Sequence, residues 1–217
     1  MHPQYRPVKS MTKEEKLNKG ISLPLMEEFY SIQGEGYHSG KAAYFIRIGG
    51  CDVGCHWCDV KESWDADIHP VTDADQIVSK VLKYAETVVI TGGEPLESNL
   101  NYLTDELKKQ HIKIHLETSG SHEMTGDFDW ICLSPKKNKP PLKAIYKKAD
   151  ELKIIIRTKK DLEFAEEQAK LVRSDCELYL QPEWSVRELI IPVLTDYVMA
   201  HPNWKISIQM HKYLNIP

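Results

Sequence analysis

The chain has 217 residues, of which 41% are hydrophobic and 28% charged, with 11 glycines and 12 prolines. This composition is that of a globular protein and excludes a collagen, a coiled coil and a disordered chain. The formal net charge of −4 and a pI near 6.1 argue against broad electrostatic binding of nucleic acid or of an anionic membrane. We therefore expect neither nucleic acid nor membrane as a partner.

The amino-terminal segment predicts a polar extension over residues 1–22, followed by a single domain over residues 23–217. The extension has no apolar run, so it is neither a signal peptide nor a membrane anchor. No later segment is apolar for long enough to span a bilayer. A cytoplasmic protein with reduced thiols is expected.

Short apolar runs alternate with helical patterns along the rest of the chain. The predicted strands are residues 25–32, 42–48, 87–91, 112–117, 130–133, 152–156, 177–180 and 205–209. Apolar residues at three- and four-residue steps predict helices at 72–85 and 161–172. Ser185 and Glu188 form a capping box, which predicts a further helix that begins either there or at Pro192.

This alternation predicts the fold class. Runs such as 88–90 and 154–156 are apolar without alternation, as in a parallel sheet covered by helices. Strand–helix repeats connected by right-handed crossovers indicate an α/β fold. Because the repeats are fewer than the eight that occupy about 250 residues in a closed barrel, we expect an incomplete (βα) barrel.

The cysteines carry the strongest chemical signal. Cys51, Cys55 and Cys58 lie together, whereas Cys132 and Cys176 stand alone in or beside predicted strands, where a thiol packs as a small hydrophobe. An odd number of cysteines excludes a fully paired disulfide framework. A structural zinc site needs four ligands, and His56 is poorly placed to be the fourth. Chance clustering is a second alternative. An iron–sulfur cluster accepts thiolates, and three of them on a [4Fe–4S] unit leave one iron open.

The C-x3-C-x-aromatic-C spacing, with Trp57 at the aromatic position, resembles the signature of the radical S-adenosylmethionine (SAM) superfamily. The segment Thr91-Gly92-Gly93-Glu94-Pro95 follows a predicted strand and resembles the motif by which that superfamily holds the methionine amine of SAM. Taken alone, it is also compatible with an ordinary glycine turn. The resemblance implies that Cys51, Cys55 and Cys58 bind a [4Fe–4S] cluster and that SAM is a cofactor.

Four further segments resemble the 7-carboxy-7-deazaguanine synthase family, from about residue 25 to the end of the chain. They are residues 30–36 (YSIQGEG), 45–48 (FIRI), 117–120 with 133–136 (ETSG and LSPK), and 211–217 (HKYLNIP). The resemblance implies a carbon–nitrogen lyase that converts 6-carboxy-5,6,7,8-tetrahydropterin to 7-carboxy-7-deazaguanine by radical ring contraction with loss of ammonia, in queuosine biosynthesis. It also implies a homodimer and a reducing protein such as a flavodoxin.

The resemblance implies a set of contacts. Cofactor contacts fall on Trp57, Gly92, Gly93, Glu94, Glu117, Ser134, Pro135, Lys136, Gln181, Pro182, Glu183 and Trp184. Substrate contacts fall on Ile32, Gln33, Gly34, Glu35, Arg47, Thr91, His211 and the carboxylate of Pro217. For that carboxylate, the alternative is a frayed terminus.

Three of these residues also have a physical interpretation of their own. Gln33 and Glu35 offer an amide and a carboxylate suited to a flat polar heterocycle. Arg47 has the strand parity of Phe45 and should point into the barrel. There it needs either a substrate carboxylate or an internal ion pair with Glu35.

Val60 departs from the family pattern, which has Thr or Ser at this position as part of a magnesium site. Valine has no oxygen to offer, so magnesium dependence stays open, with Asp59 and Ser63 as candidates to compensate through water. Two functions are alternatives to the lyase: an activase that makes a glycyl radical on a partner protein, and a zinc-binding module without catalysis.

Overall fold

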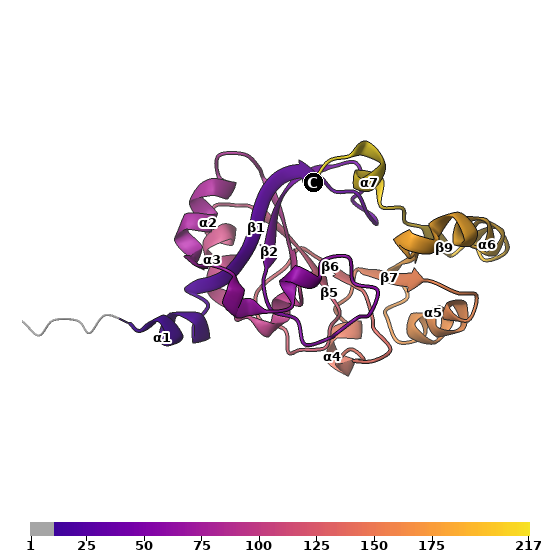
Figure 1. Ribbon diagram of the computed structural model, residues 1–217, viewed down its shortest axis with the longest axis horizontal. Helices are drawn as coiled ribbons and strands as arrows, with labels where there is room; N and C mark the ends of the chain where they lie inside the picture. Colours follow the sequence, from indigo (N-terminus) through magenta and orange to yellow (C-terminus); the bar gives the residue numbers. More distant parts are fainter. Residues whose placement is uncertain (1–10) are drawn as a thin grey trace, which may run out of the picture.

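The computed structural model describes residues 11–217 (Figure 1). Residues 1–10 of the predicted extension lie outside that range, and the part that follows forms helix α1 (Lys13–Asn18). The Thr12 hydroxyl accepts from the Glu15 N–H at 3.1 Å, and the Glu15 carboxylate accepts from the Thr12 N–H at 2.7 Å. This reciprocal capping box stabilises a short helix. Within residues 11–217, no helix has the length and apolarity needed to cross a membrane.

One nine-stranded sheet organises the described chain, in the order β3-β1-β2-β4-β5-β6-β7-β8-β9. The strands are β1 (Ser22–Ile32), β2 (Ala42–Ile48), β3 (Val71–Asp73), β4 (Thr87–Gly92), β5 (Lys113–Thr118), β6 (Trp130–Leu133), β7 (Glu151–Ile156), β8 (Glu177–Pro182) and β9 (Trp204–Ile206). β1 runs antiparallel to β2 and β3, and every pair from β2 to β9 is parallel. The sheet curves but does not close, so the expected incomplete (βα) barrel is confirmed.

Helices cover the outer face of the curved sheet (Figure 1). They are α2 (Ala74–Val81), α3 (Asn101–Lys109), α4 (Lys143–Tyr146), α5 (Asp161–Ala169) and α6 (Arg187–Ala200). Ile77 of α2 and Leu103 of α3 are fully buried with Ile46 and Ile90 of the sheet in one core cluster. A second cluster joins α4, α5 and α6 to strands β6–β9. Because these cores occupy the outer face, the inner face remains available for polar residues.

The predicted strands are all present, but several ends and helices differ. The strand predicted at 205–209 is too long: β9 covers only its first two residues and ends at Ile206, and the chain then turns into helix α7 (Met210–Leu214). The helix predicted at 72–85 begins only at Ala74, because residues 71–73 pair with β1. The short helices α3 and α4 were not predicted.

The capping box at Ser185 is also wrong. Helix α6 begins at Arg187 after Val186, which makes no side-chain capping bond, and Pro192 lies inside the helix. The Ser185 hydroxyl donates instead to Glu183, whose carboxylate accepts from the Ser185 N–H at 2.9 Å. Glu183 thus caps a short 3-10 helix (Trp184–Val186) that leads into α6. The side chain that accepts the capping hydrogen bond is therefore that of Glu183, two residues before Ser185, the cap predicted from the sequence.

Candidate active site

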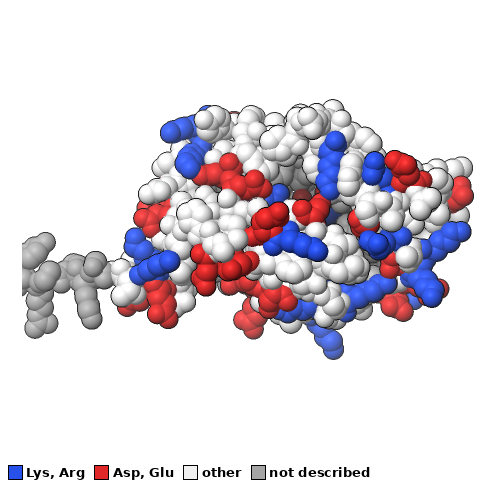
Figure 2. All heavy atoms as spheres, viewed as in Figure 1, with Lys and Arg blue, Asp and Glu red and all other residues white. Residues whose placement is uncertain are grey.

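A cavity of about 480 Å³ opens on the inner face of the sheet. Its wall includes Arg47, Thr91, Glu117 and Gln181, which lie at or near the carboxyl ends of β2, β4, β5 and β8. In Figure 2 the molecule is hollowed on this face, and side chains of both charges surround the hollow. Parallel α/β sheets bind their ligands at this edge.

The loop after β2 brings the three clustered cysteines to the cavity. Cys51, Cys55 and Cys58 are half-buried free thiols, and Cys55 and Cys58 line the cavity. The Cys58 N–H donates to the Cys55 carbonyl at 3.0 Å, which curls the loop between these two cysteines. Burial raises the pKa of the Cys51 and Cys55 thiols. A bound metal centre would supply positive charge that favours the thiolates against this effect of burial.

A set of charged groups outside the cavity holds this loop in place. Glu97 accepts from the Asp52 N–H at 2.6 Å, and the Asp52 carboxylate contacts both Lys139 and His122. Ligand atoms of Asp52, Glu97 and His122 lie within 4.8 Å of one another, as in a cation site. The Lys139 ammonium already contacts Asp52 and His122, so it supplies the compensating charge. These four residues were not predicted from the sequence, because they lie far apart in the chain.

The glycine-rich loop after β4 packs against the cysteine loop. A Cβ at Gly93 would lie 2.2 Å from the Gly50 carbonyl oxygen, so only glycine permits this approach. Glu94 is 1% exposed, and its carboxylate accepts from the Thr118 hydroxyl at 2.5 Å and the Ser119 N–H at 2.7 Å. Gly93 and Glu94 thus lie behind the cavity wall, and the Glu94 side chain is turned toward the end of β5.

Arg47 points into the cavity, as its strand parity predicts, beside the stacked rings of Phe29 and Phe45. The expected alternative ion pair with Glu35 is wrong. Arg47 pairs with Glu27 across β1–β2 at 2.6 Å, whereas Glu35 pairs with Lys153. The register of the antiparallel pair places Glu27 opposite Arg47, while Glu35 lies beyond the end of β1.

The opposite wall contains the segments expected to bind the cofactor. Lys136 donates to the Ser134 carbonyl at 2.6 Å and lies 5.6 Å from the Trp57 ring centroid, so it is not a solvated loop lysine. Burial lowers the pKa of Lys136. The Trp184 ring packs against the Arg187 guanidinium at 4.0 Å, which makes it a rigid part of the wall.

The carboxyl-terminal segment closes one side of the cavity. The Met210 N–H donates to the Gly34 carbonyl at 2.9 Å, and a Cβ at Gly34 would lie 2.3 Å from His211 Nδ1. The Ser31 hydroxyl donates to a Pro217 oxygen at 3.1 Å. In Figure 1 α7 accordingly lies beside the end of β1. Burial lowers the pKa of His211, which favours the neutral imidazole.

Most predicted site residues therefore meet in one cavity. Those that line it are Ile32, Gln33, Gly34, Glu35, Arg47, Cys55, Trp57, Cys58, Thr91, Gly92, Glu117, Ser134, Lys136, Gln181, Pro182, Glu183, Trp184, His211 and Pro217. Cys51, Gly93, Glu94 and Pro135 are not part of its lining. Sequence analysis missed Lys153, Lys212 and Phe29, which also line it. Lys153 could have been identified from the sequence, because it is the one charged residue in the predicted strand 152–156.

The residues present do not fit a magnesium ion beside Val60. The Asp59 carboxylate accepts from Lys212 Nζ at 2.6 Å. The Ser63 hydroxyl is buried and donates to the Val60 carbonyl at 2.6 Å. Both candidates for compensation are thus engaged by the protein, and valine adds no oxygen.

The chain is similar to several known proteins. The family model of the Radical SAM superfamily matches residues 45–131. The 7-carboxy-7-deazaguanine synthase of Flavobacterium psychrophilum is 59% identical over 209 residues, covering 95% of this chain and 100% of that protein. The protein of that name from Synechocystis sp. is 46% identical, covering 90% and 94% of the two chains. The crystal structure of QueE from Escherichia coli superposes with a TM-score of 0.80 at 29% identity, covering 93% of this chain and 100% of that one.

Proposed function

The chain belongs to the 7-carboxy-7-deazaguanine synthase family of radical SAM enzymes, and on that basis we propose how its cavity residues act in the ring contraction. The reaction converts 6-carboxy-5,6,7,8-tetrahydropterin to 7-carboxy-7-deazaguanine with loss of ammonia. The observation that carries the assignment of residues is the single cavity, which holds Cys55 and Cys58 on one wall and Arg47 on another.

The cysteine loop fits a [4Fe–4S] cluster. Its three thiols are free and lie on one loop. The start of that loop packs against Gly93, where a Cβ would lie 2.2 Å from the Gly50 carbonyl oxygen and 2.7 Å from the Cys51 Cβ. Cys51, Cys55 and Cys58 would hold the cluster by three of its irons, which would leave one iron open to SAM. When bound, the cluster and SAM supply an electron and the abstraction of a hydrogen atom from the substrate.

The wall formed by Trp57, Gly92, Ser134, Lys136 and the segment 181–184 binds SAM. Lys136 presents a positive charge there, which suits the methionine carboxylate. Glu94 and Glu117 act differently from each other. Glu94 is not part of the cavity lining and holds Thr118 and Ser119 in place by accepting their hydrogen bonds, whereas Glu117 lines the cavity itself.

Arg47 binds the substrate carboxylate through its guanidinium fork, and so orients the ring. Gln33 and Glu35 bind the amino and oxo groups of the pterin. Ile32, Gly34, Thr91, His211 and Pro217 complete the pocket and exclude water from it. The neutral His211 imidazole offers a hydrogen bond without adding charge.

The enzyme works without magnesium, because Asp59 is already paired with the Lys212 ammonium. It receives its electron from a reducing protein such as a flavodoxin, acts in the cytoplasm and forms a homodimer. Residues 1–22 precede a single catalytic domain over residues 23–217, and the described part of this extension, residues 11–22, does not line the cavity.

Anaerobic reconstitution tests this proposal. We expect the protein with iron and sulfide to cleave SAM when dithionite is added, and to form 7-carboxy-7-deazaguanine, detected by its mass, when the tetrahydropterin is supplied. A Cys55→Ala variant should lose both activities, whereas Cys176→Ala should keep them. SAM cleavage without formation of deazaguanine would instead favour a glycyl-radical activase. A protein that contains zinc and does not cleave SAM would favour a zinc-binding module without catalysis.

A further inference from the structure

A lysine lies at the floor of the cavity, inside the parallel sheet. Lys153 belongs to β7, and its side chain is 4% exposed. Placing an ammonium group in such a site is costly unless several acceptors surround it. A residue with this cost needs a reason beyond packing.

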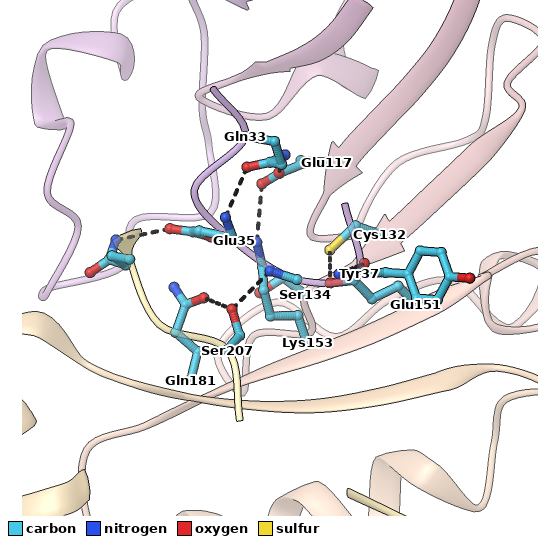
Figure 3. Close-up of polar contacts among 12 residues, drawn as sticks. Gln33, Glu35, Tyr37, Glu117, Cys132, Ser134, Glu151, Lys153, Gln181 and Ser207 are labelled. Carbon is cyan, nitrogen blue, oxygen red and sulfur yellow. Dashed lines mark hydrogen bonds and ion pairs between the residues drawn. The ribbon is translucent and has the colours of Figure 1, made fainter. Parts of the chain in front are cut away.

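The Lys153 ammonium joins two carboxylates from distant parts of the chain (Figure 3). It donates to Glu35 Oε2 at 2.5 Å and to Glu117 Oε2 at 3.2 Å. Glu35 belongs to the loop after β1, and Glu117 lies near the end of β5. Lys153 therefore fixes two cavity residues relative to each other.

Each of these carboxylates also binds an amide that faces the cavity. Glu117 Oε1 accepts from Gln33 Nε2 at 2.9 Å, and Glu35 Oε1 accepts from Gln209 Nε2 at 3.0 Å. Gln33 Oε1 in turn accepts from the Glu35 N–H at 3.1 Å. One ammonium thus sets the positions of four polar side chains, all of which line the cavity.

The other acid near Lys153 is engaged elsewhere. Glu151 is 3% exposed and accepts from the Tyr37 N–H at 3.1 Å and from Trp130 Nε1 at 3.2 Å. Burial raises the pKa of Glu151. Cys132 contacts Glu151 at 3.5 Å, and burial raises its pKa well above the ordinary range, so both groups stay protonated more readily. Glu35 and Glu117 are the acids that accept hydrogen bonds from Lys153.

The charge on Glu35 depends on the lysine. Burial alone raises the pKa of Glu35, but the charge and hydrogen bond of Lys153, aided by Gln209, lower it to about 2. Burial likewise lowers the pKa of Lys153, and the surrounding acidic groups raise it by more. The floor therefore presents two carboxylates and one ammonium, an excess of acceptors that matches the N–H groups of an amino-substituted, amide-containing heterocycle.

We propose that Lys153 is a positioning residue for substrate recognition: it holds Glu35 and Glu117 apart at fixed positions, and through them Gln33, so that they meet the amino–amide edge of the pterin. This rests on the proposed function of the cavity. Lys153 itself acts through the carboxylates, because its ammonium is buried beneath them. The family resemblance places Glu117 among the cofactor contacts, but we assign it to the substrate because it binds Gln33 and Lys153. SAM is assigned to the wall that contains Trp57 and Lys136, and its binding should not depend on Lys153.

The test compares Lys153→Met with wild type in the reconstituted enzyme. We expect the KM for the tetrahydropterin to rise by about 30-fold and kcat to fall much less, because a charged hydrogen-bonding centre is lost from the binding site only. Iron content and SAM cleavage without pterin should be unchanged. Lys205→Met is the matched control, since it removes an exposed lysine of β9 that pairs with Glu177 of β8.

A pH profile separates positioning from a loss of stability. The groups that face Lys153 are Glu35, Glu117, Glu151, Cys132 and, across the cavity, Lys136. In Lys153→Met the Glu35 pKa should rise, because burial then acts without the opposing charge of the lysine. The kcat/KM of this variant should therefore increase as the pH is raised from about 5 to 8. In wild type, Glu35 should cause no change in kcat/KM over this range. Unchanged KM and an unchanged profile in the folded variant would overturn the proposal, as would a loss of SAM cleavage in proportion to turnover.

Two further arms keep the outcomes distinct. Lys153→Arg keeps the charge but moves it, so the KM should lie between those of wild type and Lys153→Met. If Lys153→Met does not fold, an unchanged KM in Lys153→Arg overturns the role. If wild type cleaves SAM but forms no deazaguanine, it is the proposed function that fails, and the role of Lys153 fails with it.

Discussion

Glu27 and Arg47 face each other across the antiparallel pair β1–β2, and Arg47 Nε donates to Glu27 Oε1 at 2.6 Å. Among residues 11–217, no hydrogen bond engages the two terminal nitrogens of this guanidinium. The Arg47 side chain is 19% exposed and lines the cavity. Glu27 therefore orients the guanidinium by one nitrogen and leaves the fork available for a ligand carboxylate.

Replacing Arg47 by lysine should raise the KM for the tetrahydropterin by about 10- to 100-fold with little change in kcat, because an ammonium cannot make the bidentate contact. Steady-state kinetics with saturating SAM measures this. Arg173→Lys is the control, since Arg173 pairs with Asp150 and Asp175 and is not part of the cavity lining. An unaltered KM in Arg47→Lys would remove Arg47 from the substrate site.

Magnesium should not stimulate the enzyme. Asp59 is held by Lys212 and the Ser63 hydroxyl by the Val60 carbonyl, so no oxygen cluster is free for the ion. Turnover measured with increasing MgCl2, and then with a chelator, should vary by less than about twofold, with iron content followed in parallel as the control. A several-fold stimulation that saturates with magnesium would contradict this expectation.

Cys132 and Cys176 should be dispensable for cluster assembly. Both thiols are buried away from the cavity lining, and burial raises the pKa of Cys176 to about 12. A Cys132→Ala/Cys176→Ala protein should keep the iron content of wild type after reconstitution, whereas Cys58→Ala should lose most of it. Iron loss in the double variant would mean that the cluster ligands have been assigned incorrectly.

Acidification should destabilise the fold through two stacked imidazoles. The rings of His38 and His115 lie 4.2 Å apart, and burial, with the charge of His115 acting on His38, lowers the pKa of each to about 4. A lowered histidine pKa means that the unfolded chain takes up protons first. The free energy of unfolding should therefore fall as the pH drops from about 6.5 to 4.

Thermal unfolding across this pH range measures the effect, which should reach several degrees in Tm, roughly 2–4 °C for each kcal/mol in a chain of this size. His38→Phe/His115→Phe keeps the aromatic stack and removes both titrating groups. Its Tm should depend less on pH over the same range. The same slope in both proteins would show that other groups cause the acid instability.

Local patterns predicted much of the fold. The strands were placed because runs such as 130–133 are apolar and bounded by polar residues, and their ends moved by a residue or a few. The strand predicted at 205–209 was too long, because β9 ends at Ile206 and α7 begins at Met210, whose N–H donates to the Gly34 carbonyl. Pro192 misled the placement of α6, since a proline inside a helix is tolerated when the helix is anchored by packing.

By itself, the sequence determined the chemistry of the cysteine loop, the glycine-rich loop and the family, because each is encoded by residues a few positions apart. Only the tertiary structure decided which charges meet. Glu35 and Lys153 are 118 residues apart, and their pairing depends on the strand order and on where the chain crosses the cavity. The same holds for the partner of Arg47 and for Glu94, which turns toward β5. Ion pairs between distant segments depend on register and burial, and no local pattern of residues records either.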